Sequence, residues 1–301
     1  MKTIYTVTVN PAIDYVITTK TTPDTKGINR NETEEYQFGG KGINVSNMVR
    51  TLGGDTVALG FVAGFTGEGL EKGLRQMGLR TDFVHLQEGM TRINVKVRAT
   101  SDNSEMAING IGPRIGEKDL DALYQKISMI DKDDILVLSG AVSPGLPRDI
   151  YSRIMNRLKD KNVHIVVDTT GEALLDTLKY KPFLIKPNHI ELAELGCGDD
   201  VIEAAGILQK KGALNVLVSM AEKGAILLDE NKKIHTVKAP CGNVINSVGA
   251  GDSMVASFLY GYEQTGDYNF ALKMGVAAGS ATAFCAGLAT REHVQRLFDE
   301  L

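Results

Sequence analysis

The sequence predicts an α/β protein with a doubly wound, mostly parallel sheet, helices on both faces of that sheet, and a small additional β-sheet. Two observations support this fold class. From about residue 112 onward, short apolar runs alternate with amphipathic helical stretches, which is typical of strand–helix–strand units. By contrast, residues 93–99 alternate apolar and polar side chains at a period of two, as a strand with one exposed face does.

The apolar runs are short and bounded by polar residues, glycine or proline. Such runs suit strands that are covered on both faces, as in a parallel sheet. Ligands of doubly wound sheets bind beyond the carboxyl ends of the strands, so we expect the functional residues in the loops that follow these runs. The predicted strands include 135–138, 165–167, 183–185 and 214–218, and the predicted helices between and around them include 117–128, 147–158 and 201–210.

The small sheet is predicted from two separate segments. Residues 18–38 are polar and strand-like with no helical period, and residues 93–99 alternate as described above. Because a sheet with one apolar face must have that face covered, this small sheet is either a lid over a ligand or a subunit interface. The pattern alone does not choose between them.

Composition and charge narrow the class of protein. The chain has 301 residues, of which 43% are hydrophobic and 23% charged, so it has enough apolar sequence for a large core and is not a disordered chain. Lys and Arg number 33 against 37 Asp and Glu, a formal net charge of −4. That balance argues against a nucleic-acid partner, which would need a basic face.

The cysteines and the apolar segments predict a cytoplasmic location without a membrane segment. Cys197, Cys241 and Cys285 are far apart and form no C-x-x-C, which fits reduced thiols with no disulfide framework or zinc site. The amino-terminal residues enter a strand pattern without an apolar leader. Residues 274–290 carry no charge but are rich in small residues, so we expect a tightly packed buried helix there and not a membrane span.

Glycine is over-represented, and its first cluster lies at residues 38–46. The chain has 32 glycines in 301 residues, against roughly 7% in an average protein. Gly39 and Gly40 form either a flexible turn or a place where the backbone approaches a ligand. Lys41 and the start of the helix that runs to about residue 52 would attract an anion. The cluster is not a Walker A loop, because Lys41 is followed by glycine and not by Ser or Thr.

The second cluster lies at residues 246–253, directly before the uncharged segment 254–262, which we expect to be a buried helix. A turn formed by Gly249, Ala250 and Gly251 at a helix N-terminus would present free amide N–H groups to an anion. That arrangement suits the charge of a phosphoryl group in transfer. Asp252 in the first turn is either a helix-capping acid or a general base that accepts a proton from an attacking hydroxyl.

The two clusters together resemble the two signatures of the ribokinase/phosphofructokinase-B family of sugar kinases. The similar stretches are GGKGINVS at 39–46 and NSVGAGDSMVASFLYGY at 246–262, and the resemblance covers essentially the whole chain. Residues 7–14, 91–113 and 139–147 are similar to the branch of the family that contains 1-phosphofructokinase and tagatose-6-phosphate kinase, with the former the closer match. One departure is Thr66, which stands where many relatives carry Asp in a strand-to-helix turn; we expect a purely structural turn there.

This resemblance implies a ribokinase-like fold. The main α/β domain would comprise residues 1–14, 37–89 and 112–301, and the β lid residues 15–36 and 90–111, often shared across a homodimer. It implies ATP and Mg²⁺ as cofactors, and a monovalent cation near the second motif whose ligands the sequence does not place.

The resemblance also assigns site residues. Asp252 is similar to the catalytic base, with the anion-hole amides supplied by Gly249, Ala250 and Gly251. Alternatives remain open for two substrate residues: Asp14 could be a turn residue, and Arg92 a solvated lid charge. The positions similar to the substrate-binding set are Asp14, Gly39, Gly40, Lys41, Asn44, Arg92 and Ser139. Those similar to the nucleotide-binding set are Lys186, Asn188, Ser219, Gly224, Ser253 and Gly279 together with residues 249–252, and those similar to the Mg²⁺ set are Asn188 and Glu191.

The expected function is ATP-dependent phosphorylation of fructose 1-phosphate to fructose 1,6-bisphosphate. Lys41 and Arg92 suit a sugar that already carries a phosphate. Tagatose-6-phosphate kinase and 6-phosphofructokinase activities remain alternatives, because the same cations can hold a phosphate at either end of a sugar. A non-catalytic regulator that binds sugar phosphate or nucleotide is a further alternative, which the Gly-Ala-Gly-Asp sequence argues against. A dinucleotide-binding oxidoreductase is set aside, since no G-x-G-x-x-G follows the first strand.

Overall fold

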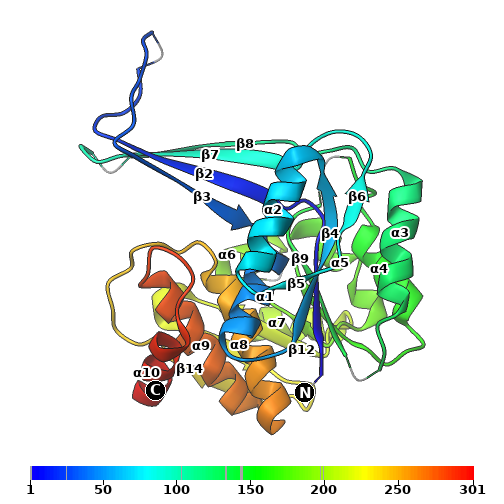
Figure 1. Ribbon diagram of the computed structural model, residues 1–301. Helices are drawn as coiled ribbons and strands as arrows, with labels where there is room; N and C mark the ends of the chain where they lie inside the picture. The colour runs from blue at the N-terminus through cyan, green and yellow to red at the C-terminus, as the bar shows by residue number, and fades with distance from the viewer. Residues whose placement is uncertain are drawn as a thin grey trace.

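The computed structural model describes residues 2–24, 26–102, 104–132, 134–142, 145–196, 198 and 200–301. Cys197 lies outside the described residues, as do Ser143 and Pro144 in the middle of the 139–147 motif. Within the described part of the chain, ten strands form one sheet and four strands form a second, smaller sheet (Figure 1). The predicted α/β class with an additional β-sheet is confirmed.

The central sheet is mostly parallel. Its strands follow the order β14-β13-β12-β11-β10-β9-β1-β4-β5, and β6 also pairs with β4. The pairings from β12 to β5 and β6 are parallel, whereas β13 and β14 add an antiparallel edge. The strands are β1 (Ile4–Thr8), β4 (Thr56–Ala63), β5 (Arg80–Thr81), β6 (Val84–Leu86), β9 (Ile135–Ser139), β10 (His164–Asp168), β11 (Leu184–Ile185), β12 (Asn215–Ser219), β13 (Ala225–Leu228) and β14 (Ile234–Val237).

Helices cover both faces of this sheet, because successive side chains of a strand point to opposite sides. In β9, Leu136 and Leu138 pack into the core formed with α3, α4 and α7, while Ile135 and Val137 pack into the core formed with α1, α8, α9 and α10. The helices are α1 (Lys41–Thr51), α2 (Gly64–Gln76), α3 (Glu117–Ser128), α4 (Ile150–Leu158), α5 (Gly171–Leu175), α6 (His189–Glu194), α7 (Val201–Lys210), α8 (Ala250–Thr265), α9 (Tyr268–Ala283) and α10 (Arg291–Glu300), with short 3₁₀ turns at Leu178–Tyr180 and Ala221–Lys223.

The predicted helices over 117–128 and 201–210 coincide with α3 and α7. The predicted helix over 147–158 begins three residues late, at Ile150. The N–H of Ile150 donates to the carbonyl oxygen of Pro147 at 3.0 Å, so Pro147 belongs to a turn that precedes the helix.

The buried helix predicted over 274–290 is wrong in its second half. Helix α9 is buried as expected but ends at Ala283. The carbonyl oxygen of Ala283 accepts the N–H groups of Ile245 and Asn246, at 2.8 and 3.1 Å, and the Ala289 N–H returns to Thr282 Oγ1 at 3.3 Å. These tertiary hydrogen bonds take the place of the next helical turn. Of the described helices, none has both the length and the hydropathy needed to cross a membrane.

The smaller sheet has the strand order β3-β2-β7-β8 and contains β2 (Ala12–Thr19), β3 (Thr33–Gly39), β7 (Arg92–Ala99) and β8 (Glu105–Asn109). We call this sheet the lid; Figure 1 shows it projecting from the top of the main body. The strand-like stretch predicted over 18–38 is wrong in its middle, because β2 ends at Thr19 and β3 begins at Thr33. Between them, Asp24 and Asn29 exchange turn hydrogen bonds at 2.9 and 2.7 Å, which compete with strand pairing.

The lid contacts α2 closely at Phe38. The ring of Phe38 in β3 occupies the space where a Cβ of Gly73 would lie, 2.0 Å from the nearest ring carbons. Gly73 is buried in the middle of α2, while Gly69, one turn earlier on the same helix, has no neighbouring atom within 4 Å of its Cβ position.

These two glycines allow a matched test of the contact between Phe38 of the lid and α2. Gly69→Ala should raise the free energy of unfolding by about 0.5–1 kcal/mol, because alanine loses less backbone entropy than glycine in a helix. Gly73→Ala should be about 1–3 kcal/mol less stable than Gly69→Ala, since it displaces the Phe38 ring. Denaturant unfolding of both variants measures this difference, and equal stabilisation by both would contradict the contact.

Candidate active site

A cavity of about 990 Å³ lies where the lid meets the carboxyl ends of the parallel strands. Its walls come from lid strands β2 and β7, the turn into α1, the segments after β10, β11 and β12, and the first turn of α8. Most of the predicted site residues meet there: Asp14, Gly39, Gly40, Lys41, Asn44, Arg92, Lys186, Asn188, Glu191, Ser219, Gly224, Gly249, Ala250, Gly251, Asp252 and Gly279.

Asp252 lies in the first turn of α8 at the centre of this cavity. Gly249 precedes the helix with a φ of 80°, a left-handed value that glycine adopts readily. Asp252 is only 5% exposed. Its Oδ2 accepts a hydrogen bond from Nδ2 of Asn44 in α1 at 2.8 Å, so its carboxylate is directed across the cavity floor and does not cap its own helix.

The pKa of Asp252 is raised toward neutral pH. Burial raises it to about 6, and the negative charge of Asp168 acts in the same direction. The hydrogen bond from Asn44 and the positive charges of Lys41 and Lys186 oppose this rise. A carboxylate with such a pKa is a stronger base than an ordinary aspartate, yet it is ionised at neutral pH.

Asp168 is a buried carboxylate held between two lysines. It ends β10 and is 2% exposed. Its Oδ1 lies 3.3 Å from Nζ of Lys186, and its Oδ2 lies 3.5 Å from Nζ of Lys41. Burial disfavours its charge, but the two ammonium groups outweigh burial and lower its pKa. Burial likewise acts against the charge of Lys41, whereas Asp168, Asp252 and Glu191 raise its pKa. Lys41 therefore keeps its positive charge beside the cavity.

The α8 turn presents a different set of amides from the one that the sequence predicts. The N–H of Ala250 donates to the Ser247 carbonyl oxygen at 3.2 Å, so this amide is engaged. The N–H groups of Gly249, Gly251 and Asp252 make no hydrogen bond to the described residues. A Cβ at Gly251 would lie 3.3 Å from Nζ of Lys186, which places that ammonium beside the helix N-terminus. The turn and the lysine together form an anion site.

The lid supplies a second polar cluster around Asp14. Its Oδ1 accepts from Nδ2 of Asn94 at 2.7 Å, and its Oδ2 pairs with Nζ of Lys96, also at 2.7 Å. A Cβ at Gly39 would lie 3.1 Å from the same Oδ2. Asp14 is thus held by side chains of the neighbouring strand, so it does not act as the turn residue that the sequence left open as an alternative.

Arg92 lies at the base of the lid and lines the cavity. Its Nε donates to the carbonyl oxygen of Asn10 at 3.2 Å, which fixes the side chain while leaving its terminal NH₂ groups for another acceptor. Burial lowers its pKa, and the charge of Asp14 opposes that effect. It is a half-buried cation at a fixed position, unlike a solvated surface charge.

Asn188 and Glu191 form a helix cap at the other end of the cavity. Oδ1 of Asn188 accepts the N–H groups of Ile190 and Glu191, at 2.9 and 2.8 Å, and Oε2 of Glu191 accepts the N–H of Asn188 at 2.8 Å. This reciprocal capping box starts α6. It leaves Oε1 of Glu191 without a hydrogen bond to the described residues. His189, the first residue of α6, is exposed.

The described residues contain no group of three or more His, Cys, Asp and Glu side chains placed to hold a metal ion. Mg²⁺ does not require one, since it keeps several waters and usually takes one or two carboxylates together with phosphate oxygens. The carboxylate of Glu191 fits such a role. The side-chain oxygen of Asn188 is already used twice by α6.

The chain matches the model of the pfkB family carbohydrate kinases over residues 7–294. The chain belongs to this family. It is 43% identical to the 1-phosphofructokinase of Bacillus subtilis, over 99% of this chain and 98% of that one. It is 38% identical to the D-tagatose-1-phosphate kinase of Bacillus licheniformis, over 95% and 94% of the two chains. Membership makes it a carbohydrate kinase, an enzyme that transfers a phosphoryl group to a sugar.

Solved structures agree with this family. Phosphofructokinase-2 of Escherichia coli in complex with fructose 6-phosphate superposes with a TM-score of 0.92 at 28% identity, covering 100% of this chain and 99% of that one. Ribokinase of Arabidopsis thaliana superposes with a TM-score of 0.81 at 21% identity, over 99% of each chain. The ribokinase-like fold implied by the two glycine motifs is confirmed.

Two predicted site residues do not line the pfkB-family cavity. Ser253 is fully buried; its Oγ accepts from Thr282 Oγ1 at 2.8 Å, and its N–H donates to the Gly249 carbonyl oxygen at 2.8 Å. It packs α8 against α9 and offers no group to a nucleotide. Ser139 ends β9 and is 1% exposed, and its Oγ has no hydrogen-bond partner among the described residues.

Three residues of the site are absent from the sequence prediction. Asp168 directly follows the predicted strand 165–167, so the rule that ligands bind beyond carboxyl ends of strands could have identified it. Asn94 and Lys96 lie two residues apart in the segment predicted to alternate, on the same face as Arg92. Their contact with Asp14 depends on the pairing of β2 with β7, which the sequence does not show.

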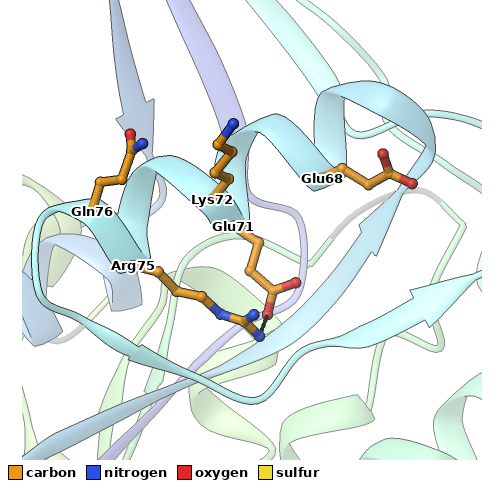
Figure 2. A pocket seen from close by; sticks show the side chains of 5 residues that line it. All are labelled: Glu68, Glu71, Lys72, Arg75 and Gln76. Carbon is orange, nitrogen blue, oxygen red and sulfur yellow. Dashed lines mark hydrogen bonds and ion pairs between the residues drawn. The ribbon is translucent and has the colours of Figure 1, made fainter.

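Two features outside the cavity are structural. Thr66, which replaces the family Asp, is buried in the first turn of α2, and its Oγ1 donates to the Thr91 carbonyl oxygen at 2.8 Å, as expected for a strand-to-helix turn. A shallow hollow of about 440 Å³ lies along the same helix, where Figure 2 shows the ion pair of Glu71 and Arg75. Its two acids and two bases, all from one helix, cancel in charge and favour no ligand.

The effect of Asp168 on Asp252 predicts a pH shift. If ionised Asp252 is needed for turnover, activity should fall as pH decreases through about 6. Asp168→Asn removes a negative charge that disfavours ionisation of Asp252, so the midpoint of this acid limb should move to lower pH. The pH dependence of kcat/KM, which reports ionisations of the free enzyme, measures this midpoint whatever the absolute rate of the variant.

Asp55→Asn serves as the control for this experiment, because Asp55 pairs with Arg80 at an exposed position. Its acid limb should coincide with that of the unaltered enzyme. The same substrate is used throughout, so titration of the substrate phosphate cancels in the comparison. An unchanged midpoint in Asp168→Asn would contradict the electrostatic coupling.

Proposed function

We propose that this kinase phosphorylates the O6 hydroxyl of fructose 1-phosphate with ATP, producing fructose 1,6-bisphosphate and ADP. The observation that carries the proposal is the placement of Asp252, a buried carboxylate with a pKa of about 6, beside unpaired helix amides, the buried Lys186 and the partly exposed Lys41. The identity of 43% with the B. subtilis 1-phosphofructokinase supports fructose 1-phosphate as the acceptor.

Asp252 acts as the general base in this proposal. It takes the proton of the acceptor hydroxyl while the oxygen forms a bond to the γ-phosphorus, and the bond between that phosphorus and the leaving oxygen of ADP breaks in line. The amides of Gly249 and Gly251 and the ammonium of Lys186 stabilise the negative charge of the transferring group. Ala250 contributes through the shape of the turn, since its own amide is bonded to Ser247.

The sugar phosphate occupies the lid side of the cavity. Asp14 and Asn44 bind sugar hydroxyls there, and Gly39 and Gly40 allow the backbone to approach the ring. Arg92 binds the phosphate that does not react, using the NH₂ groups that its bond to Asn10 leaves available. Ser139, at the end of β9, is predicted to contact this phosphate as well, although it does not line the cavity.

The nucleotide occupies the opposite side, along Lys186, Asn188, Ser219, Gly224 and Gly279. Glu191 would hold Mg²⁺ through water, with Asn188 orienting Glu191 through the helix cap. Mg²⁺ in such kinases neutralises charge on the β- and γ-phosphates. A monovalent cation near the second motif remains part of the proposal, supported by a structure of E. coli phosphofructokinase-2 in complex with potassium.

The lid would also join two copies of this chain in the cytoplasm. Its strands β2 and β3 extend beyond the predicted lid segment 15–36, to Ala12 and Gly39. Its edge strands expose large apolar side chains, namely Tyr36 on β3 and Met106 and Ile108 on β8, which are 47–68% exposed. Apolar side chains gathered on a small sheet suit a protein contact. For E. coli phosphofructokinase-2, a tetrameric inhibited form is reported.

A second acceptor, tagatose 1-phosphate, is favoured by one observation, the identity of 38% with a D-tagatose-1-phosphate kinase. Tagatose 6-phosphate and fructose 6-phosphate remain the alternatives with the phosphate at the other end. A regulator without catalysis would have no use for a base at position 252.

Removing the base tests the mechanism. Asp252→Asn should lower kcat by about 10²–10⁴-fold, because general base catalysis is lost, while the KM values for both substrates change little. Steady-state kinetics measure this. Asp267→Asn is the control, since this exposed helix cap of α9 keeps its capping oxygen as Asn. Activity of Asp252→Asn within tenfold of the unaltered enzyme would remove Asp252 from the role of base.

A substrate panel tests the acceptor. ADP release with MgATP should show kcat/KM for fructose 1-phosphate at least tenfold above that for fructose 6-phosphate, tagatose 1-phosphate, tagatose 6-phosphate, ribose and adenosine. Preference for another sugar phosphate would reassign the substrate. No ADP release with any of them would favour the regulator.

A further inference from the structure

Lys96 and Asn94 hold both oxygens of the Asp14 carboxylate from the neighbouring strand. Nζ of Lys96 lies 2.7 Å from Oδ2, and Nδ2 of Asn94 lies 2.7 Å from Oδ1. The Asn94 amide is itself oriented, because its Oδ1 accepts the N–H of Gly110 at 3.2 Å. The carboxylate is therefore fixed at both ends by donors that do not depend on a substrate.

The strand register creates this arrangement. Strands β2 and β7 run parallel, with Asp14 opposite Asn94 and Val16 opposite Lys96. Because side chains of a strand alternate between faces, Arg92, Asn94 and Lys96 share one face of β7. Asp14 thus has a cation on each side along the strand: Arg92 toward the base of the lid and Lys96 farther out.

Lys96 differs from its neighbours in one respect. Asp14, Arg92 and Asn94 all line the cavity, whereas Lys96 does not. Its side chain is 25% exposed, against 13% for Asp14. Lys96 therefore reaches Asp14 from the outer part of the lid, beyond the residues that line the space where a sugar would bind.

We propose that Lys96 is a positioning residue that determines how Asp14 binds the sugar. With one oxygen tied to Lys96 and the other to Asn94, the carboxylate can turn only a limited set of lone pairs toward the cavity. Each oxygen can accept two hydrogen bonds, so one position per oxygen remains for sugar hydroxyls in a fixed direction. The positive charge of Lys96 also offsets the negative charge of Asp14, which would otherwise repel an anionic sugar phosphate. This inference rests on the proposed function.

The test is a double-mutant cycle with fructose 1-phosphate and MgATP. Lys96→Met should raise the KM for fructose 1-phosphate at least tenfold, with the KM for ATP and kcat changed less than threefold. Lys96→Arg should restore most of the lost affinity, because it keeps a charged donor. In an Asp14→Asn background, Lys96→Met should change the KM for the sugar phosphate less than twofold, since it acts through Asp14.

Arg98→Met is the control, because Arg98 is the next cation on β7 and pairs with Glu105 at 2.9 Å. Its KM values should stay within twofold of the unaltered enzyme. Equal KM increases by Lys96→Met with and without Asp14 would show direct contact with the substrate and overturn the inference. An unchanged KM for fructose 1-phosphate in Lys96→Met would also overturn the inference. A parallel rise in the KM for ATP would overturn it too, because it would indicate a structural role. Lack of turnover in the unaltered enzyme would instead refute the proposed function.

Discussion

The site depends on one buried carboxylate. Asp168 brings Lys41 of α1 and Lys186 of the segment after β11 to within 3.5 Å of its two oxygens. A buried charge is tolerated only when it is paired, and removing one partner leaves the others uncompensated. In this protein, the pairing keeps two lysines beside the cavity. Burial is the larger cause of the raised pKa of Asp252, and the negative charge of Asp168 adds to it. The proposed base and the lysines of the proposed phosphate site are thus electrostatically linked through Asp168, which is not itself the proposed base.

The fold makes this linkage possible because parallel strands end at one edge. Strands β10 and β11 are neighbours in the sheet, so Asp168 and Lys186 lie side by side at their ends. The N-termini of α1 and α8 point at the same edge. The lid then adds a separate cluster around Asp14, whose hydrogen-bond donors come from β7. One polar cluster belongs to the main body and the other to the lid, with the cavity between them. This division is what a two-substrate transfer enzyme needs, because each substrate can be held by its own group of residues.

Much of this arrangement could be predicted from the sequence, since the two glycine motifs and the alternating strands and helices are local patterns. Several of the failures involve contacts between distant segments. Helix α9 ends at Ala283 because the 245–246 segment takes its carbonyl oxygen, although no charge or proline marks that end. Asp168 meets Lys41 across 127 positions, and Lys96 meets Asp14 across 82. Ser253 belongs to the motif, yet it follows Asp252 on a helix and so points about 100° away, into the contact with α9.

The most direct test of this account is the pKa of Asp252 itself. ¹³C NMR titration of carboxyl-labelled aspartate, with Asp252→Asn used to assign the resonance, would measure it without reference to turnover. The account predicts a midpoint of about 6 in the unaltered protein and a lower midpoint when Asp168 is replaced by Asn. A midpoint near 4, the ordinary value for aspartate, would show that burial and Asp168 do not activate this carboxylate and would contradict the central claim.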